Sequence, residues 1–255
     1  MATNISIDLN GQTALITGAT SGFGVRFAGI LSAAGAKVVL TGRREERLIA
    51  VKNKIEASGG CAVALPLDVT NTAKIKDCVD EAEHRAGRIS ILVNNAGLNI
   101  QSSVTALQEH DYDTIMDTNV KGMFFMAQTV GARMLHHKIQ GRIVNIASIG
   151  AFKPLPGLTA YSMSKAAVAM MTKGMAREWA KNHIAVNAIC PGFIKTELNS
   201  DWFETEGGQK QIMGFPRRRV GTESDLDATL LLLCSSHANF ITGSLFTIDD
   251  GQLLT

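Results

Sequence analysis

The fold is decided by Thr13-Ala-Leu-Ile-Thr17-Gly18-Ala-Thr-Ser-Gly22-Phe-Gly24, a short apolar run that ends in three glycines. An amphipathic stretch from Val25 to Ala34 follows, so the chain reads as a strand, a tight turn and a helix. Glycines let the backbone approach a pyrophosphate, whose charge the amides at the start of the helix can hold. The spacing is G-x-x-x-G-x-G rather than the common G-x-G-x-x-G, and tight turns also need glycine. Its place between a strand and a helix predicts a dinucleotide site.

The alternation of apolar runs and helical stretches continues along the chain. Further strands are expected at 38–40, 61–65, 89–93, 142–147, 185–189 and 245–248, with helical patterns between them, the longest at about 109–137 and 159–181. Continuous apolar strands that alternate with helices indicate a parallel sheet covered on both faces. We therefore predict an α/β fold, in which residues 1–255 form a single Rossmann-type domain with a doubly wound parallel sheet of about seven strands.

The composition of the chain narrows the class of protein. The net charge of +2 is small and the basic residues are scattered, apart from Arg217-Arg218-Arg219, which argues against nucleic-acid binding. No apolar run reaches the ~20 residues of a membrane span, and the N-terminus resembles no signal peptide, so we expect a cytoplasmic protein without a membrane partner. The four cysteines lie far apart, and the adjacent His136 and His137 would point in different directions on a helix. No metal site is predicted.

The second strand is followed by Gly42-Arg43-Arg44, where an NAD-binding protein would usually have an acidic residue. A carboxylate there would repel the 2′-phosphate of NADP, whereas an arginine can bind it. We therefore predict NADP(H) rather than NAD(H), with Arg43 and Arg44 near the phosphate. The alternative is that the two arginines only begin a solvated helix.

A possible proton donor lies at Tyr161-Ser-Met-Ser-Lys165. On a helix, Tyr161 and Lys165 share one face, which places an ammonium beside a phenol. A neighbouring cation favours the phenolate and lowers the phenol pKa from about 10, so Tyr161 could serve as a general acid or base. Seen alone, the pair also fits an ordinary surface contact.

Six motifs together resemble the short-chain dehydrogenase/reductase family over nearly the whole chain. They are the glycine turn, Asn94-Asn-Ala-Gly97, Asn119, Ser148, Tyr161-x-x-x-Lys165 and Pro191-Gly192. The resemblance implies that Tyr161 protonates a carbonyl oxygen during reduction and that Ser148 positions that oxygen. It also implies that Lys165 lowers the Tyr161 pKa and holds the nicotinamide ribose, while Asn119 holds a water that links Lys165 to solvent.

The resemblance also assigns the remaining cofactor contacts. Gly18, Ser21, Phe23 and Gly24 would hold the pyrophosphate, and Asp68 and Val69 would border the adenine. The ribose and nicotinamide ends would be lined by Asn94, Ala96, Gly97, Pro191, Gly192, Ile194 and Thr196.

The substrate pocket is less well specified. Residues 195–219, called the lid segment below, are expected to cover the nicotinamide, with Gly207-Gly208 as a possible hinge. The predicted pocket residues are Leu98, Ile149, Leu155, Phe193, Leu198, Trp202 and Met213. Their apolar character suits a neutral ketone or secondary alcohol. Alternatively, Arg217-Arg218-Arg219 could face the phosphate of an acyl carrier or of coenzyme A, as in 3-oxoacyl thioester reductases of this family, or could be a solvated cluster.

We therefore predict an NADP(H)-dependent carbonyl reductase that also runs in reverse as an alcohol dehydrogenase. The alternatives are a 3-oxoacyl-thioester (acyl-carrier-protein) reductase and an NADP(H)-sensing protein of the same fold that has lost the chemistry. A sensor has no need of the proton donor, so the presence of all four catalytic residues argues against it. The resemblance also implies a homotetramer.

Overall fold

The computed structural model describes residues 6–197 and 199–255. Within these residues, seven strands form one parallel sheet, as predicted, and their order is β3-β2-β1-β4-β5-β6-β7. The strands are β1 (Thr13–Thr17), β2 (Lys37–Gly42), β3 (Ala62–Pro66), β4 (Ile91–Asn94), β5 (Arg142–Ile146), β6 (Ala185–Pro191) and β7 (Leu245–Ile248). The strand order reverses between β1 and β4. Ligands bind at such a switch point, beyond the carboxyl ends of the strands.

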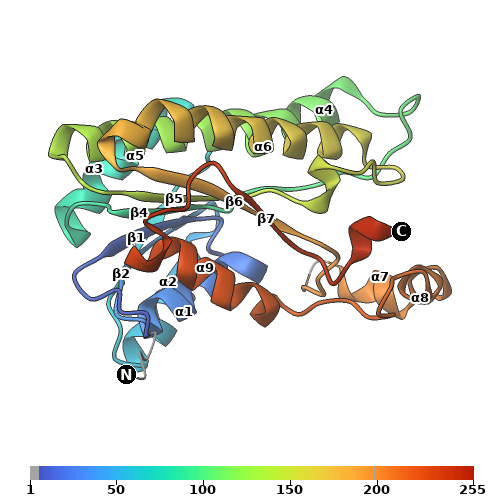
Figure 1. Cartoon of the computed structure of the whole chain (residues 1–255), viewed down its shortest axis with the longest axis horizontal. Coiled ribbons are helices and arrows are strands. Elements are labelled where there is room, and N and C mark those ends of the chain that lie inside the picture. Colours follow the sequence, from blue (N-terminus) through green and yellow to red (C-terminus); the bar gives the residue numbers. More distant parts are fainter. Residues whose placement is uncertain (1–5, 198) are drawn as a thin grey trace.

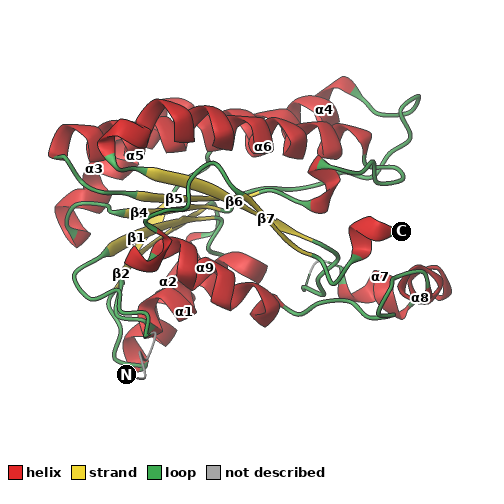
Figure 2. Cartoon of the chain, in the orientation of Figure 1, coloured by secondary structure: helices red, strands yellow, loops and turns green. Residues whose placement is uncertain are grey.

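Helices cover both faces of the sheet (Figure 1). One face carries α1 (Gly22–Ala33), α2 (Glu45–Ala57) and α9 (Asp227–Cys234). The other carries α3 (Ile75–Ala86), α4 (Glu109–Met116), α5 (Met123–His137) and α6 (Thr159–Trp179). Two short helices, α7 (Ser200–Glu204) and α8 (Glu206–Met213), lie beyond the edge of these layers, next to the C-terminal end (Figure 2). The 3₁₀ helices are Thr72–Lys74, Ile149–Ala151, Ala180–Asn182, Glu223–Leu226, Ser236–Ala238 and Gln252–Leu254.

The core has one apolar layer on each side of the sheet. Along β1, Ala14 and Ile16 pack with Phe27 of α1 on one side, while Leu15 packs with the α3, α5 and α6 layer on the other. Successive residues of a strand point to opposite faces, so a strand buried on both sides is continuously apolar. The same pattern explains why the strands could be located from the sequence. Within the described residues, no helix is both long and apolar enough to cross a membrane.

The long helix expected at 109–137 is interrupted. Between α4 and α5, residues Asp117–Gly122 form a π-helical stretch, in which Asn119 is fully buried. Such stretches often occur at functional sites. Gly122 ends it where a Cβ atom would lie 2.8 Å from the Val69 carbonyl oxygen, so only glycine allows this close contact. The interruption directs Asn119 towards the carboxyl end of the sheet.

Candidate active site

Tyr161 and Lys165 lie one turn apart at the start of α6, on one face of the helix. The Lys165 Nζ lies 5.6 Å from the centre of the Tyr161 ring and donates a hydrogen bond of 2.8 Å to the Ile146 carbonyl oxygen. Lys165 is 4 % exposed, and this burial lowers its pKa to about 8. The residue therefore remains predominantly charged at neutral pH.

The pKa of Tyr161 differs from the expectation. Burial raises the pKa of Tyr161 above its ordinary value, while a hydrogen bond with Ser148 acts in the opposite direction. The predicted lowering by Lys165 is thus not the outcome in this structure, because desolvation of the phenolate is the larger effect. The hydrogen bond of the Lys165 ammonium goes to the Ile146 carbonyl oxygen.

Ser148 lies just after β5, on the chain that leads to α6. Its backbone is extended, and its hydroxyl accepts a hydrogen bond of 3.0 Å from the Gly150 amide, which begins the short helix Ile149–Ala151. The hydroxyl hydrogen is still available to a carbonyl oxygen. Cys190 of β6, which the sequence analysis did not single out, is buried beside Ser148 and Lys165, and burial raises its pKa to about 11. It is therefore a neutral thiol.

Asn119 connects two segments of the site. Its Nδ2 donates to the Leu98 carbonyl oxygen at 2.9 Å and to Ser164 Oγ at 3.0 Å, and its Oδ1 accepts from the Leu98 amide at 2.9 Å. A Cβ atom on Gly97 would lie 3.2 Å from Asn119 Oδ1 and 3.4 Å from Lys165 Nζ, so glycine leaves open the space between them. Ser164, which also donates to the Tyr161 carbonyl oxygen at 2.6 Å, was missed. Its spacing of three residues from Tyr161 was the available signal.

We call Asn119, Ser148, Tyr161 and Lys165 the catalytic edge. They come from the π-helical stretch, the end of β5 and the start of α6, and they meet beyond the carboxyl ends of β4 and β5. Three of them are buried, and each of those three is hydrogen-bonded to backbone atoms.

The glycine turn brings β1 against β4. Gly18 has a φ of +69°, and a Cβ atom on Gly24 would lie 2.2 Å from the Gly18 carbonyl oxygen, so both positions require glycine. Thr17 Oγ1 accepts from the amides of Asn95 and Ala96, both at 2.9 Å, and Asn95 Nδ2 donates to the Thr17 carbonyl oxygen at 2.9 Å. Asn95, also missed, thus holds the turn in place.

The start of α1 can hold an anion. Ser21 is the N-cap residue but makes no capping hydrogen bond, so the first amides of α1 remain available to an anion. Ser21 Oγ and Thr20 Oγ1 instead accept from Arg44, at 3.0 and 2.7 Å. The side chain of Phe23 packs against Phe27, so only the backbone of Phe23 can take part.

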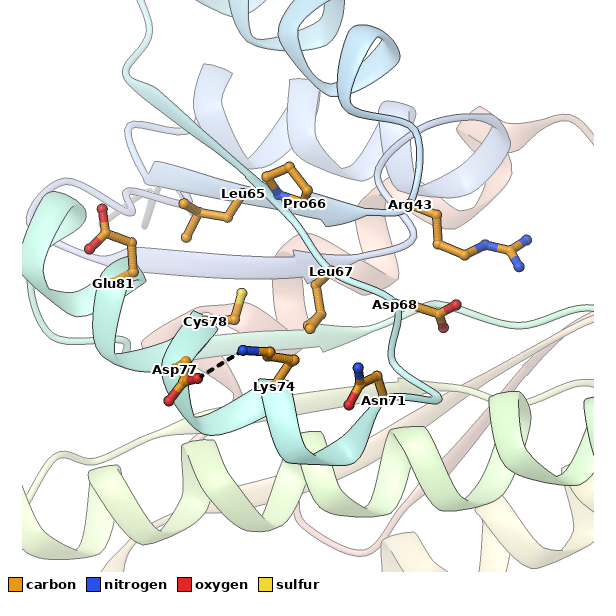
Figure 3. A pocket seen from close by; sticks show the side chains of 10 residues that line it. All are labelled: Arg43, Leu65, Pro66, Leu67, Asp68, Asn71, Lys74, Asp77, Cys78 and Glu81. Carbon is orange, nitrogen blue, oxygen red and sulfur yellow. Dashed lines mark ion pairs between the residues drawn. The ribbon is translucent and has the colours of Figure 1, made fainter.

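Arg43 lines a cavity of about 490 Å³. Figure 3 shows Arg43 and Asp68 at one end of this cavity and Cys78 and Glu81 at the other. Asp68 Oδ1 accepts from the amide and the hydroxyl of Thr70, at 3.0 and 2.8 Å, which fixes the turn after β3. Val69 is buried beside Gly122. Arg43, Asp68 and Val69 thus lie near one another at the carboxyl ends of β2 and β3.

Two predicted cofactor residues direct their side chains elsewhere. Asn94 is 1 % exposed, and its Nδ2 donates to the Met123 carbonyl oxygen at 2.8 Å, so its side chain faces α5 rather than a ribose. Ile194 is buried in the core and forms an isolated bridge with Gly221. Only the backbone of these residues can line a cofactor. Ala96, Gly97, Pro191, Gly192 and Thr196 lie at or just beyond the carboxyl ends of β4 and β6.

The predicted pocket residues differ in their exposure to solvent. Ile149 and Leu155 are buried, Leu98 is half-buried, Trp202 and Met213 are exposed on the lid segment, and Leu198 lies outside the described residues. Phe193 stacks on Phe215 with a centroid separation of 5.4 Å and meets Phe203 edge to face.

The expected hinge at Gly207-Gly208 lies within α8. A Cβ atom on Gly208 would lie 2.0 Å from the Trp202 carbonyl oxygen, so this glycine allows α8 to pack tightly against α7. The described residues contain no group of three or more potential metal ligands.

Comparison with known proteins gives consistent results. A family model described as short chain dehydrogenase matches residues 12–207. The chain is 34 % identical to a gluconate 5-dehydrogenase of Gluconobacter oxydans over 95 % of each chain. It is 33 % identical to a 3-oxoacyl-(acyl-carrier-protein) reductase of Thermotoga maritima, over 96 % of this chain and 99 % of that one. A structure of gluconate 5-dehydrogenase from Burkholderia cenocepacia, in complex with NADP and tartrate, matches with a TM-score of 0.93 and 32 % identity over 98 % of each chain.

Proposed function

Because the chain belongs to the short-chain dehydrogenase/reductase family, we propose that it transfers a hydride between NADP(H) and a ketone or secondary alcohol. Tyr161 is the general acid in reduction and the base in oxidation. The observation that carries the proposal is the catalytic edge: a phenol beside an enclosed ammonium and close to a serine hydroxyl, at the switch point of the sheet. An NADP(H)-sensing protein would not need these groups.

The residues of the catalytic edge have different roles in proton transfer. The bound cofactor supplies or accepts the hydride. The Ser148 hydroxyl donates to the substrate oxygen and holds it near the phenol, and Tyr161 transfers its proton to that oxygen. Lys165 keeps a positive charge next to the ring. This charge favours the phenolate that forms when Tyr161 gives up its proton.

Protons are returned to Tyr161 through the space beside Gly97. Both Asn119 Oδ1 and Lys165 Nζ border this space, and the second lone pair of Oδ1 can accept from a water there. Lys165 also keeps N–H groups beyond the one it donates to Ile146. A water at this position would join Lys165 to solvent.

We propose NADP(H) as the cofactor. The free amides at the start of α1 and the glycines of the turn fit a pyrophosphate, while Arg43 fits the 2′-phosphate. The NADP in the Burkholderia structure supports the assignment. Arg43→Asp should change the preference from NADPH towards NADH. If NADH is turned over as efficiently as NADPH by the wild type, the assignment to NADP(H) is wrong.

We also propose a homotetramer, assembled through α4, α5, α6 and β7. Helices α5 and α6 carry exposed apolar side chains, namely Phe124, Phe125, Met163 and Met170. Apolar patches on a protein surface often mark an interface. A monomer in light scattering would refute this assembly.

The experiment that tests the activity follows the consumption or formation of NADPH with three groups of substrates. They are simple ketones, 3-oxoacyl thioesters and, in the oxidative direction with NADP⁺, gluconate. The 3-oxoacyl thioesters represent a second candidate function, which the similarity to the Thermotoga reductase favours. Chiral analysis of the alcohol would give the stereochemistry. An enzyme that binds NADPH but consumes it with none of these compounds would support the sensing alternative.

A further inference from the structure

Asp250 has an unusual backbone conformation just after β7. Its φ is +54°, in the left-handed region that favours glycine, and the chain continues with Gly251 at +84°. The Asp250 side chain is only 16 % exposed. A largely enclosed carboxylate in this conformation needs contacts that hold it there.

Two arginines from the end of the lid segment provide those contacts. Arg217 Nη1 donates to Asp250 Oδ1 at 2.9 Å, and Arg219 Nε lies 2.7 Å from Oδ2, in a charge contact that lacks hydrogen-bond geometry. Arg219 Nη1 also lies 3.9 Å from Asp225 Oδ2. Arg217 and Arg219 therefore each face a carboxylate of the same chain.

These contacts lie next to residues 191–196, which are expected to line the nicotinamide end of the cofactor. A cavity of about 160 Å³ is lined by Arg219 and Asp250 together with Phe193 and Ile194. The Gly221 amide donates to the Phe193 carbonyl oxygen at 2.9 Å, which connects the chain just after the lid segment to this region. The Phe193 amide in turn donates to Gln252 Oε1 at 2.7 Å. The chain after β7 therefore meets both the end of the lid segment and the residues that follow β6.

We propose that Asp250 is a specificity-determining residue. It fixes the C-terminal end of the lid segment and keeps Arg217 and Arg219 from binding phosphate-bearing acyl carriers. The inference rests on the proposed function and narrows its substrates to carbonyl compounds free of such a carrier. An arginine binds phosphate through its charge and its paired N–H donors. In Arg217 and Arg219, the enclosed carboxylate of Asp250 already neutralises part of the charge and occupies one of the nitrogen atoms.

The test compares 4′-phosphopantetheine, which carries the phosphate of an acyl carrier, with pantetheine, which lacks it. Binding of each is measured by calorimetry to protein saturated with NADPH, so that the cofactor site is already filled. Asp250→Asn keeps the shape of the side chain, tolerates the left-handed backbone and removes the charge. Asp250→Gly removes the side chain and any backbone strain.

The wild type should bind the two compounds equally weakly. Both Asp250 variants should bind 4′-phosphopantetheine about tenfold more tightly than pantetheine. Combining Asp250→Asn with Arg217→Ala and Arg219→Ala should abolish that preference, which a merely structural role would not predict. Equal binding by the Asp250 variants would overturn the proposal, as would a tenfold preference for the phosphorylated compound in the wild type.

Hydrogen exchange gives an independent readout of the lid segment. Amides of residues 206–219 should exchange faster in Asp250→Asn than in the wild type, while those of β1 and β4 should not change. Unchanged exchange at 206–219 would show that Asp250 does not fix the segment. Neither measurement requires turnover, so an inactive wild type would refute the proposed function without obscuring these results.

Discussion

The catalytic edge and the lid segment are stabilised by different kinds of interaction. At the catalytic edge, Asn119 and Lys165 are buried and bonded to the backbone. In the lid segment, Trp202 and Met213 are exposed, and Lys195 forms a surface ion pair with Glu204. Buried polar groups have to be bonded and are therefore fixed in place, whereas surface ion pairs contribute little. The reaction type should depend on the first region, and the choice of substrate on the second.

The largest effect is expected from Lys165→Met, which keeps most of the side-chain volume and removes the charge. We expect kcat/KM for ketone reduction to fall at least about a hundredfold, since the phenol loses its neighbouring cation. NADPH should also bind more weakly, because Lys165 is proposed to hold the ribose. Fluorescence titration with NADPH measures the second effect. Unchanged NADPH affinity would remove the ribose role.

The same variant tests whether the catalytic edge lowers stability. Burial lowers the Lys165 pKa from 10.5 to about 8, so between these pH values the folded protein binds fewer protons than the unfolded chain. Wild-type stability should therefore gain from this group as the pH rises through that window. At pH 7, Lys165→Met should be more stable than the wild type by on the order of 2 kcal/mol. Urea unfolding should show the difference shrinking towards pH 10.5. A stability difference between the variant and the wild type that does not change with pH would contradict the lowered Lys165 pKa.

Asn119→Ala should have a smaller effect on turnover than Lys165→Met and an effect on stability of the opposite sign. It leaves the Leu98 amide and carbonyl without their side-chain partner, which should destabilise the protein by about 1–3 kcal/mol. Turnover of the folded enzyme should fall roughly tenfold as the proton path is broken. Asn94→Ala is the matched control, because Asn94 is also buried and hydrogen-bonded but lies outside that path. Equal turnover in the two variants would refute the role of Asn119.

The smallest effect is expected in the lid segment. Phe215→Leu loosens the stack on Phe193 and should raise KM for the ketone roughly threefold, with little change in kcat. Lys210→Ala, at an exposed position of the same segment, should leave both constants unchanged. A larger fall in kcat than rise in KM for Phe215→Leu would mean that the lid segment takes part in the chemical step.

The sequence predicted the sheet because buried parallel strands are continuously apolar. It also singled out the glycine turn and the four residues of the catalytic edge, whose roles stay predictions. It did not reveal the π-helical stretch at Asn119, since one additional residue per turn barely changes the periodicity of a helix. Nor did it show that Asn94 turns towards α5, because side-chain direction at a strand end depends on the neighbouring elements.

Contacts between distant segments account for the other differences. Arg217 and Arg219 stand in a basic run in the sequence, but the run does not show that both contact Asp250, which lies 33 residues from Arg217. The expected effect of Lys165 on Tyr161 considered charge alone, whereas burial of the phenol is the larger influence on its pKa. Both cases depend on packing that periodicity and spacing do not contain.

The central claim is that Tyr161 donates the proton, and Tyr161→Phe tests it most directly, because it keeps the ring and removes the phenol hydroxyl. We predict that turnover of NADPH with a reactive ketone falls at least about a hundredfold, while the affinity for NADPH stays within about twofold of the wild type. If the variant retains more than a few per cent of wild-type turnover with NADPH binding intact, Tyr161 is not the acid.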